Sequence, residues 1–180
     1  MGMKLLFIGG GNMAQALIGG LLQRGLALAE AVHVVEPQAA TRTHLVQQWG
    51  VNTHADLASA PLAVDVVVLA VKPQQLREVV RPLAGRLQQT LVISIAAGIR
   101  AADIARWLGD YRCIVRVMPN TPALVGQGMS GLFALDGVSA TERARAEQLL
   151  AAVGQTVWCA QESALDAVTA ISGSGPAYVD

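Results

Sequence analysis

A glycine-rich turn near the amino terminus has the residue types and spacing to hold a phosphorylated ligand. Residues 9–14, Gly-Gly-Gly-Asn-Met-Ala, fit the pattern G-x-G-x-x-G/A directly after an apolar run at 4–8. The first glycine permits a tight turn, the second lets a pyrophosphate approach the backbone, and a small third residue lets a helix pack on the strand. Amides at the helix start then face the phosphates. A turn without a ligand is the alternative, and the strand context together with Glu36 favours a nucleotide.

An acidic side chain follows the second apolar run, where a dinucleotide places its adenosine ribose. Glu36 comes directly after residues 32–35, and its carboxylate would accept hydrogen bonds from ribose hydroxyls. That arrangement favours NADH, because the carboxylate would repel a 2′-phosphate. Arg42 lies one or two helical turns further on and could reach such a phosphate, although a solvated helix face is its plainer interpretation. The choice between NADPH and NADH therefore stays open.

Three later loops follow apolar runs and consist mostly of small residues. They are residues 70–73 (Ala-Val-Lys-Pro), 94–98 (Ser-Ile-Ala-Ala-Gly) and 118–122 (Met-Pro-Asn-Thr-Pro). Ligands of open parallel sheets bind at the carboxyl ends of the strands, so these loops are expected to line the same crevice. Their small side chains would let a nicotinamide ribose lie against backbone. Ordinary turn chemistry is the alternative for each loop.

The elements that must position these loops alternate regularly between strand and helix. Apolar runs predict strands at 4–8, 32–35, 64–71, 91–95, 113–117 and 156–158, and helical spacing predicts helices after the glycine turn and at 39–49, 74–87, 100–108 and 141–153. The two prolines of residues 118–122 predict a loop. Such alternation indicates an α/β fold with a doubly wound parallel sheet. The pattern changes at residue 163, so we expect a dinucleotide-binding domain at 1–162 and the start of a helical second domain at 163–180.

Composition narrows the class of partner to a small molecule. Thirteen basic residues balance thirteen acidic ones, and charged residues make up only 14% of the 180, which leaves no electrostatic footprint for nucleic acid or an anionic membrane. Cys113 and Cys159 form no C-x-x-C motif, so neither a disulfide framework nor a metal site is expected, and reduced cytosol is the simplest location. The uncharged stretch at 5–23 changes from strand-like to helical spacing, which argues against a signal peptide or membrane span.

Five motifs occur together in one order: residues 9–13, 70–73, 94–98, 118–122 and 172–178 (Ser-Gly-Ser-Gly-Pro-Ala-Tyr). Together they closely resemble the pyrroline-5-carboxylate reductases, over essentially the whole chain. The resemblance implies an amino-terminal Rossmann domain that binds NADPH or NADH, and a helical domain, opened by residues 172–178, that makes a homo-oligomer. It also implies hydride transfer from NAD(P)H to the C=N bond of 1-pyrroline-5-carboxylate, which gives L-proline in the cytoplasm.

The resemblance also assigns cofactor contacts residue by residue. The expected contacts are Ile8, Gly9, Gly10, Gly11, Asn12 and Met13 at the pyrophosphate, Glu36 at the adenosine ribose, and Ala70, Val71, Lys72, Pro73, Ile95, Ala96 and Ala97 along the nicotinamide half. The family continues for roughly another hundred residues, a domain-sized length that includes its substrate loop. No catalytic residue is therefore assigned here, and we expect the substrate contacts to lie beyond Asp180. Activity of these 180 residues by themselves stays open.

Two other functions compete with this interpretation. A β-hydroxyacid dehydrogenase has a similar fold, but its pattern puts a lysine four residues after the last glycine of a Gly-x-Gly, where this chain has Val179. A nucleotide-binding module without turnover is the other. An imine can be protonated before hydride arrives, so the reductase interpretation demands no positioned general acid. His33, His44 and His54 fall in a predicted strand, helix and early loop, and we expect them to be structural or exposed.

Overall fold

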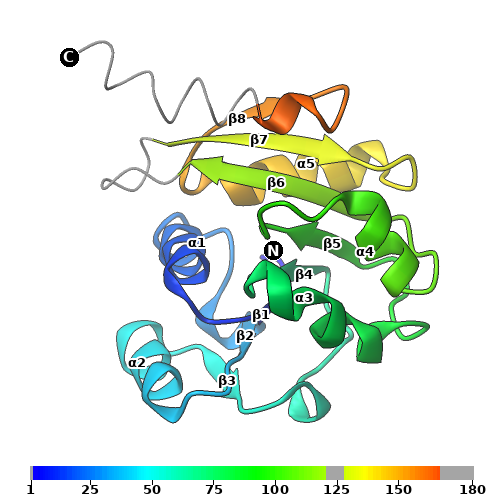
Figure 1. Cartoon of the computed structure of the whole chain (residues 1–180). Coiled ribbons are helices and arrows are strands. Elements are labelled where there is room, and N and C mark those ends of the chain that lie inside the picture. The colour runs from blue at the N-terminus through cyan, green and yellow to red at the C-terminus, as the bar shows by residue number, and fades with distance from the viewer. Residues whose placement is uncertain (1, 121–127, 167–180) are drawn as a thin grey trace.

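The chain forms one sheet covered by helices on both faces (Figure 1). The computed structural model describes residues 2–120 and 128–166. Within these ranges the strands are β1 (Leu5–Ile8), β2 (Val32–Val35), β3 (Asn52–His54), β4 (Val66–Leu69), β5 (Leu91–Ser94), β6 (Ile114–Asn120), β7 (Gly128–Ala134) and β8 (Gly154–Trp158). The helices are α1 (Asn12–Gln23), α2 (Ala39–Trp49), α3 (Pro73–Val80), α4 (Ala101–Trp107) and α5 (Ala140–Ala151).

The strand order is β3-β2-β1-β4-β5-β6-β7-β8, and every neighbouring pair is parallel except β6 and β7. The chain winds outward from β1 in one direction through β2 and β3. It then returns to the other side of β1 at β4 and continues outward through β5 and β6. The order therefore reverses between β1 and β4, which confirms the predicted doubly wound α/β fold and marks the position at which folds of this kind bind ligands.

Two apolar layers sandwich the sheet because its central strands are buried on both faces. In β1, Leu5 and Phe7 point into the layer packed by α1, α2 and α5. Leu6 and Ile8 point into the layer packed by α3 and α4. All four side chains are at most 3% exposed. A continuous apolar strand of this kind is typical of a covered parallel sheet, and burying each such side chain contributes about 1.5–3 kcal/mol.

The predicted loop at 118–122 is wrong in its first part. β6 continues to Asn120, and Met118 and Pro119 pair antiparallel with Gly131 and Ser130. Pairing of β6 with β5 stops at Arg116, so beyond that point β6 has one neighbouring strand. A proline is tolerated there because its missing N–H removes no bond to a second neighbour. Residues 121 and 122 lie outside the described residues.

Two strands and one helix end also differ from the sequence expectations. β3 was expected to be a loop, and it places His54 on a strand; its three residues are polar and half-buried, which hides strand character. β7 was not predicted, since two of its seven residues are glycines, which weaken strand propensity. The helix expected at 74–87 ends at Val80 and gives way to a 3₁₀ turn at Arg81–Leu83, because Pro82 cannot continue an α-helix.

The segment after β8 leads toward the predicted second domain. Residues 164–166 are helical, at the place where the sequence pattern changes. The rest of that expected helix and the motif at 172–178 lie outside the described residues, so the domain boundary stays a prediction. Over the ranges 2–120 and 128–166, no helix combines the length and apolar character needed to cross a membrane.

Candidate functional site

The carboxyl ends of three adjacent strands bring the predicted site segments together. Ile8 of β1, Leu69 of β4 and Ser94 of β5 are in register. Backbone bonding continues one residue past the strands, because the Ala70 N–H donates to the Ile8 carbonyl at 2.8 Å and the Ile95 N–H donates to the Leu69 carbonyl at 3.1 Å. The glycine turn and the loops at 70–73 and 95–97 therefore lie side by side at the strand-order reversal.

The first and last glycines of the glycine turn differ in the space around them. Gly9 has φ +102, and a Cβ there would lie 2.6 Å from the Ala70 carbonyl oxygen. The predicted tight turn is thereby confirmed, and the structure adds that the turn lies close against the residue after β4. Gly11 is exposed, and a Cβ built on it would meet no atom of the described residues within 4 Å. Ala14 is 1% exposed, which confirms that a small third residue packs α1 against the sheet.

Helix α1 begins at this turn without a side-chain cap. Gly11 is the N-cap residue, no side chain caps the helix, and its first turn carries no acidic residue. The Gln15 N–H donates to the Gly11 carbonyl at 2.9 Å, so the amides of residues 12–14 precede the first intrahelical bond. Asn12 is exposed and Met13 half-buried. A helix start of this kind carries partial positive charge and can receive an anion over Gly11.

Glu36 lies beside the glycine turn, as its placement after β2 suggested. One carboxylate oxygen, Oε1, accepts a hydrogen bond from the Gly10 N–H at 3.0 Å, and the other, Oε2, accepts from the Gln38 N–H at 3.0 Å. Each carboxylate oxygen has a second lone pair, so both can accept a further donor such as a ribose hydroxyl. Glu36 thus also fixes the glycine turn, which its position in the sequence does not reveal.

Arg42 is more than a solvated side chain of α2. Its Nη1 donates to the carbonyls of Glu36 and Pro37, both at 2.8 Å, and the residue is half-buried. The guanidinium therefore lies against the loop between β2 and α2. A positive charge is thereby held next to the Glu36 backbone.

The remaining predicted contacts differ in how accessible they are. Lys72 is exposed and is the N-cap of α3, and Pro73 occupies the first turn, where its missing N–H costs nothing. Ala97 is exposed and Ala96 is buried. Ile8 is 3% exposed with its side chain in the α3/α4 layer, so only its backbone reaches the crevice. Ala70, Val71, Pro73 and Ile95 are half-buried.

The histidines make contacts away from the ends of β4 and β5. His33 and His54 stack across β2 and β3, with Nδ1 of His33 3.0 Å from Nε2 of His54. Burial, followed by the charge of His54, lowers the pKa of His33. His44 is exposed on α2 and meets the edge of Trp49.

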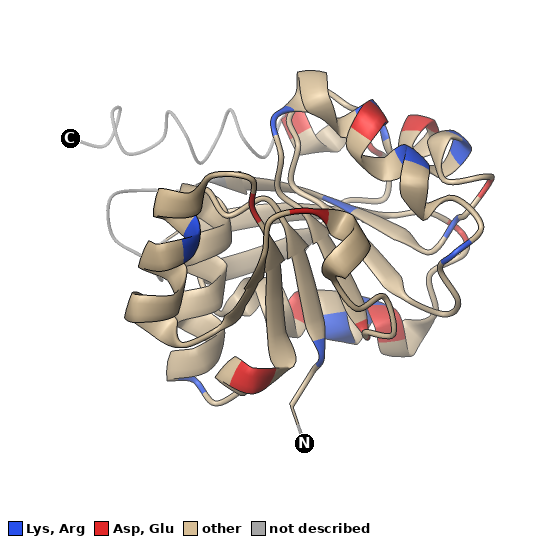
Figure 2. Cartoon of the chain, turned by 90° about the horizontal axis from the view of Figure 1, so that it is seen from below, with Lys and Arg blue, Asp and Glu red and all other residues tan. Residues whose placement is uncertain are grey.

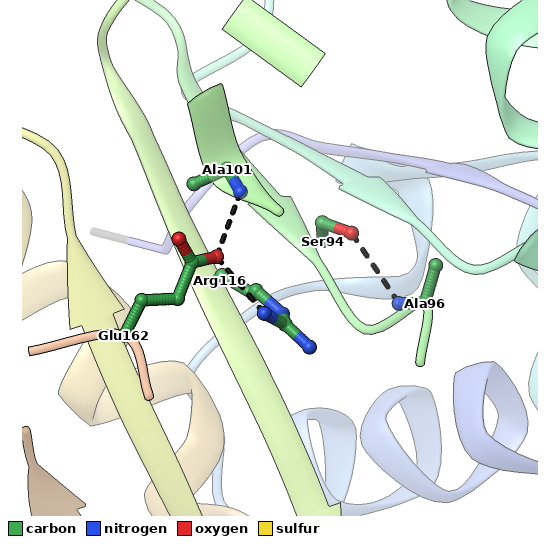
Figure 3. Close-up of polar contacts among 5 residues, drawn as sticks. All are labelled: Ser94, Ala96, Ala101, Arg116 and Glu162. Atoms are coloured by element: carbon green, nitrogen blue, oxygen red, sulfur yellow. Dashed lines mark hydrogen bonds and ion pairs between the residues drawn. The ribbon is translucent and has the colours of Figure 1, made fainter. Parts of the chain in front are cut away.

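Two charged residues that the sequence analysis did not single out lie next to the β5 loop. Arg116 of β6 is 6% exposed, and its Nη1 lies 2.9 Å from Oε2 of Glu162. The same carboxylate oxygen accepts the Ala101 N–H at 2.8 Å (Figure 3). The run Ile-Val-Arg-Val at 114–117 carried a signal for Arg116, because a charge inside a buried strand calls for a partner. Glu162 carried no such signal.

Charged side chains elsewhere are interspersed. In Figure 2, blue and red segments alternate over helices and loops of the described chain without a large patch of one sign.

Comparisons with known proteins point to one group of enzymes. Residues 4–98 match the family model "NADP oxidoreductase coenzyme F420-dependent". The chain is 47% identical to pyrroline-5-carboxylate reductase of Pseudomonas aeruginosa over 176 residues, which is 97% of this chain and 64% of that protein. The chain thus spans a little under two thirds of this curated relative.

Solved structures with this fold include two that bear on the site. A pyrroline-5-carboxylate reductase from Coxiella burnetii superposes with a TM-score of 0.91 at 40% identity, over 99% of this chain and 67% of that one. Pyrroline carboxylate reductase of Plasmodium falciparum, solved with NADP bound, has a TM-score of 0.80 at 29% identity, over 98% of this chain and 64% of that one.

Proposed function

The chain belongs to the NADP oxidoreductase, coenzyme F420-dependent family and, within it, to the pyrroline-5-carboxylate reductases; on this premise we propose that it forms the cofactor-binding part of an enzyme that reduces 1-pyrroline-5-carboxylate to L-proline. The bound NAD(P)H supplies hydride to the C=N carbon, and the imine nitrogen receives a proton. The residues of this chain hold and orient the dinucleotide.

One observation carries the proposal: the open space over Gly11 at the strand-order reversal. A Cβ at Gly11 would meet no atom of the described residues within 4 Å, while Gly9 is locked against β4. The uncapped start of α1 faces that space, so its amides can donate to pyrophosphate oxygens. A turn built only for packing has no need of this opening.

In this proposal, three groups of residues each bind one part of the dinucleotide. Backbone at residues 8–13 holds the pyrophosphate. Glu36 accepts hydrogen bonds from the adenosine ribose while its carboxylate keeps the glycine turn in place. The loops at 70–73 and 95–97 take the nicotinamide half, because they follow β4 and β5 directly beside the turn.

Glu36 and Arg42 bear in opposite directions on the choice of cofactor. The Glu36 carboxylate repels a 2′-phosphate and so favours NADH. The Arg42 guanidinium, held at the carbonyl of Glu36, attracts that phosphate and so favours NADPH. We propose that either dinucleotide binds, with the balance set by these two side chains. The NADP complex of the Plasmodium falciparum relative supports the binding of NADPH.

The proposal extends to partners and location. The substrate is a small molecule, the complete enzyme is a cytoplasmic homo-oligomer assembled through its helical domain, and neither nucleic acid nor a membrane takes part. Balanced charge supports the last point.

The test compares two forms of the protein. One is the 180-residue chain, and the other continues the same residues into the remaining part of the Pseudomonas aeruginosa relative. We expect both to bind NADPH or NADH and only the longer form to oxidise it in the presence of the imine. A substrate that is not held loses an orientation effect that can reach roughly 7–11 kcal/mol of the barrier. Near-full turnover by the 180 residues would contradict this division of labour, and absence of binding would contradict the cofactor assignment.

A further inference from the structure

The buried side chains of Ser94 and Arg116 lie next to the loop at 95–100, which joins β5 to α4. Ser94 ends β5 and Arg116 is its register partner on β6, so both side chains point to the α3/α4 face of the sheet. Ser94 is fully buried and Arg116 is 6% exposed. The Ser94 Oγ accepts the Ala96 N–H at 3.3 Å, which holds the near end of the loop from below (Figure 3).

Glu162 holds the far end of the same loop. Its Oε2 accepts the Ala101 N–H at 2.8 Å, where α4 begins, and lies 2.9 Å from Nη1 of Arg116. One carboxylate oxygen thereby joins three segments that are distant in the sequence: the start of α4, the strand β6, and the turn that follows β8. The loop at 95–100 is fixed at both of its ends.

Burial makes this contact different from a surface ion pair. The Arg116 side chain is 7% exposed and the Glu162 side chain 18%, whereas the ion pair of Arg112 with Asp136 is 43% and 78% exposed. Nε of Arg116 is buried and has no hydrogen-bond partner within the part of the chain that the structure describes. A guanidinium withdrawn from water has few alternative positions. Glu162 is its ion-pair partner, and the pair holds the Glu162 carboxylate in place.

We propose that Glu162 and Arg116 are positioning residues for the nicotinamide half of the dinucleotide, acting through the loop at 95–100. The inference rests on the proposed function, because that function places the nicotinamide half along Ile95, Ala96 and Ala97. The bonds of Glu162 go to the start of α4 and to Arg116 of β6, whereas the pyrophosphate turn and Glu36 follow β1 and β2 and are bonded to each other. Disturbing the pair should therefore weaken the recognition of nicotinamide and leave the adenosine half bound as before.

The experiment measures each half of the cofactor separately by calorimetric titration of the 180-residue chain. NADPH is compared with 2′-phospho-ADP-ribose, and NADH with ADP-ribose, since each fragment lacks only nicotinamide. For Glu162→Gln we expect dinucleotide affinity to fall about tenfold, as for the loss of one charge-assisted hydrogen bond, and fragment affinity to stay unchanged. Asp136→Asn is the matched control, because it breaks an exposed ion pair of Arg112, just before the start of β6, and it should change neither affinity.

A second pair of variants guards against loss of folding. Glu162→Gln leaves a buried charge without its partner, so Arg116→Met/Glu162→Gln removes both charges at similar volume. This double variant should melt cooperatively and show the same loss confined to the dinucleotides. Arg116→Lys keeps a positive charge opposite Glu162 and should retain more dinucleotide affinity than Arg116→Met.

The outcomes separate this inference from the proposed function. Equal losses for dinucleotide and fragment in a folded variant, or no loss for either, would overturn the positioning role while leaving the cofactor site standing. Failure of the unaltered chain to bind any of the four ligands would overturn both.

Discussion

The Gly10 N–H donates to Oε1 of Glu36 across 3.0 Å, so the acidic residue at the end of β2 holds the glycine turn at the end of β1. A Cβ on Gly10 would lie 3.3 Å from that same oxygen and 2.9 Å from Leu45, which leaves no room for a side chain. The residue proposed to select the ribose thus also shapes the pyrophosphate site. Changes at Glu36 are expected to affect both.

Gly11→Val should abolish dinucleotide binding and leave the fold intact. The added side chain enters space that the structure leaves open, where the pyrophosphate would lie, so affinity should fall by at least about 100-fold while stability changes by about 0.5 kcal/mol or less. Titration of nicotinamide fluorescence and a thermal melt check the two parts. Gly9→Val is the contrasting variant, because φ +102 and a contact of 2.6 Å with Ala70 should make it unfold the site. Unchanged affinity in folded Gly11→Val would contradict the pyrophosphate assignment.

Glu36→Ser should shift preference toward NADPH, because it removes a negative charge that faces the 2′-phosphate. We expect the ratio of NADPH to NADH dissociation constants to fall about tenfold. Glu36→Gln separates the two roles of the residue, since its amide oxygen can still accept the Gly10 N–H. The Gln variant should show the shift in preference with a smaller loss of overall affinity. A preference for NADH that stays the same or strengthens would place Glu36 away from the ribose.

Arg42→Gln tests the opposing charge. Its guanidinium donates to the Glu36 and Pro37 carbonyls, and its removal should weaken NADPH about tenfold while NADH binding changes little. Arg24→Gln, at the exposed far end of α1, is the control. Equal weakening of both cofactors by Arg42→Gln would show that Arg42 only supports the loop.

Ser139→Ala should lower the free energy of unfolding by about 1 kcal/mol. Ser139 and Glu142 form a capping box at the start of α5, in which the Ser139 Oγ accepts the Glu142 N–H at 3.2 Å and Glu142 Oε1 accepts the Ser139 N–H at 2.9 Å. Urea denaturation followed by circular dichroism gives the difference. Thr141→Ala, in the same first turn and exposed, should have little effect. Because alanine has the higher helix propensity, a loss of the same size in Thr141→Ala would mean that the effect at Ser139 is not specific to the cap.

Stability should fall as pH rises above about 9. Burial raises the pKa of the Cys113 thiol to about 12, and a hydrogen bond to Glu142 adds to the shift. Burial likewise raises the pKa of Tyr111 to about 12. The unfolded groups ionise at their ordinary values near 9 and 10, so between those values and 12 the unfolded chain binds fewer protons and the folded state loses stability. Denaturation at pH 8 to 11 measures the slope.

Cys113→Ala should make that slope shallower, because one of the two shifted groups is then absent. The control is Cys159→Ala: burial also raises the pKa of the Cys159 thiol, but among the described residues only Cys113 has a carboxylate contact that adds to its shift, so removal of Cys159 should flatten the slope less. A slope that is identical in all three proteins would exclude Cys113 as its source. Iodoacetamide at pH 8 should correspondingly react slowly with folded Cys113.

The parts of the fold that could be predicted are those where one local signal decides the outcome. The bounds of β2 and α2 agree with the sequence pattern, since an apolar run and a proline delimit the first and helical spacing the second. β3 and β7 could not be predicted, because their residues become strands only through neighbours. The extension of β6 through Pro119 likewise depends on β7 lying beside it.

In the candidate site, too, the features with a local sequence signal could be predicted, and those that depend on distant contacts could not. A glycine pattern after a strand indicated the turn, and chain position indicated Glu36. Nothing local reveals that Glu36 accepts the Gly10 N–H, or that Glu162 reaches Ala101 and Arg116 across 61 and 46 positions of sequence. Contacts of that kind are fixed by the packing of the whole domain.

The central place of β1 has a consequence for the order in which the site comes into being during translation. β1 leaves the ribosome before both of its neighbours in the sheet, of which β4 begins only at Val66, and the carbonyl that crowds Gly9 belongs to Ala70. The nascent chain can pair β1 with β2 early, but the glycine turn acquires its final geometry only after residue 70 has emerged. A dinucleotide that binds as proposed can therefore find the complete glycine turn only on a chain that has been translated past β4.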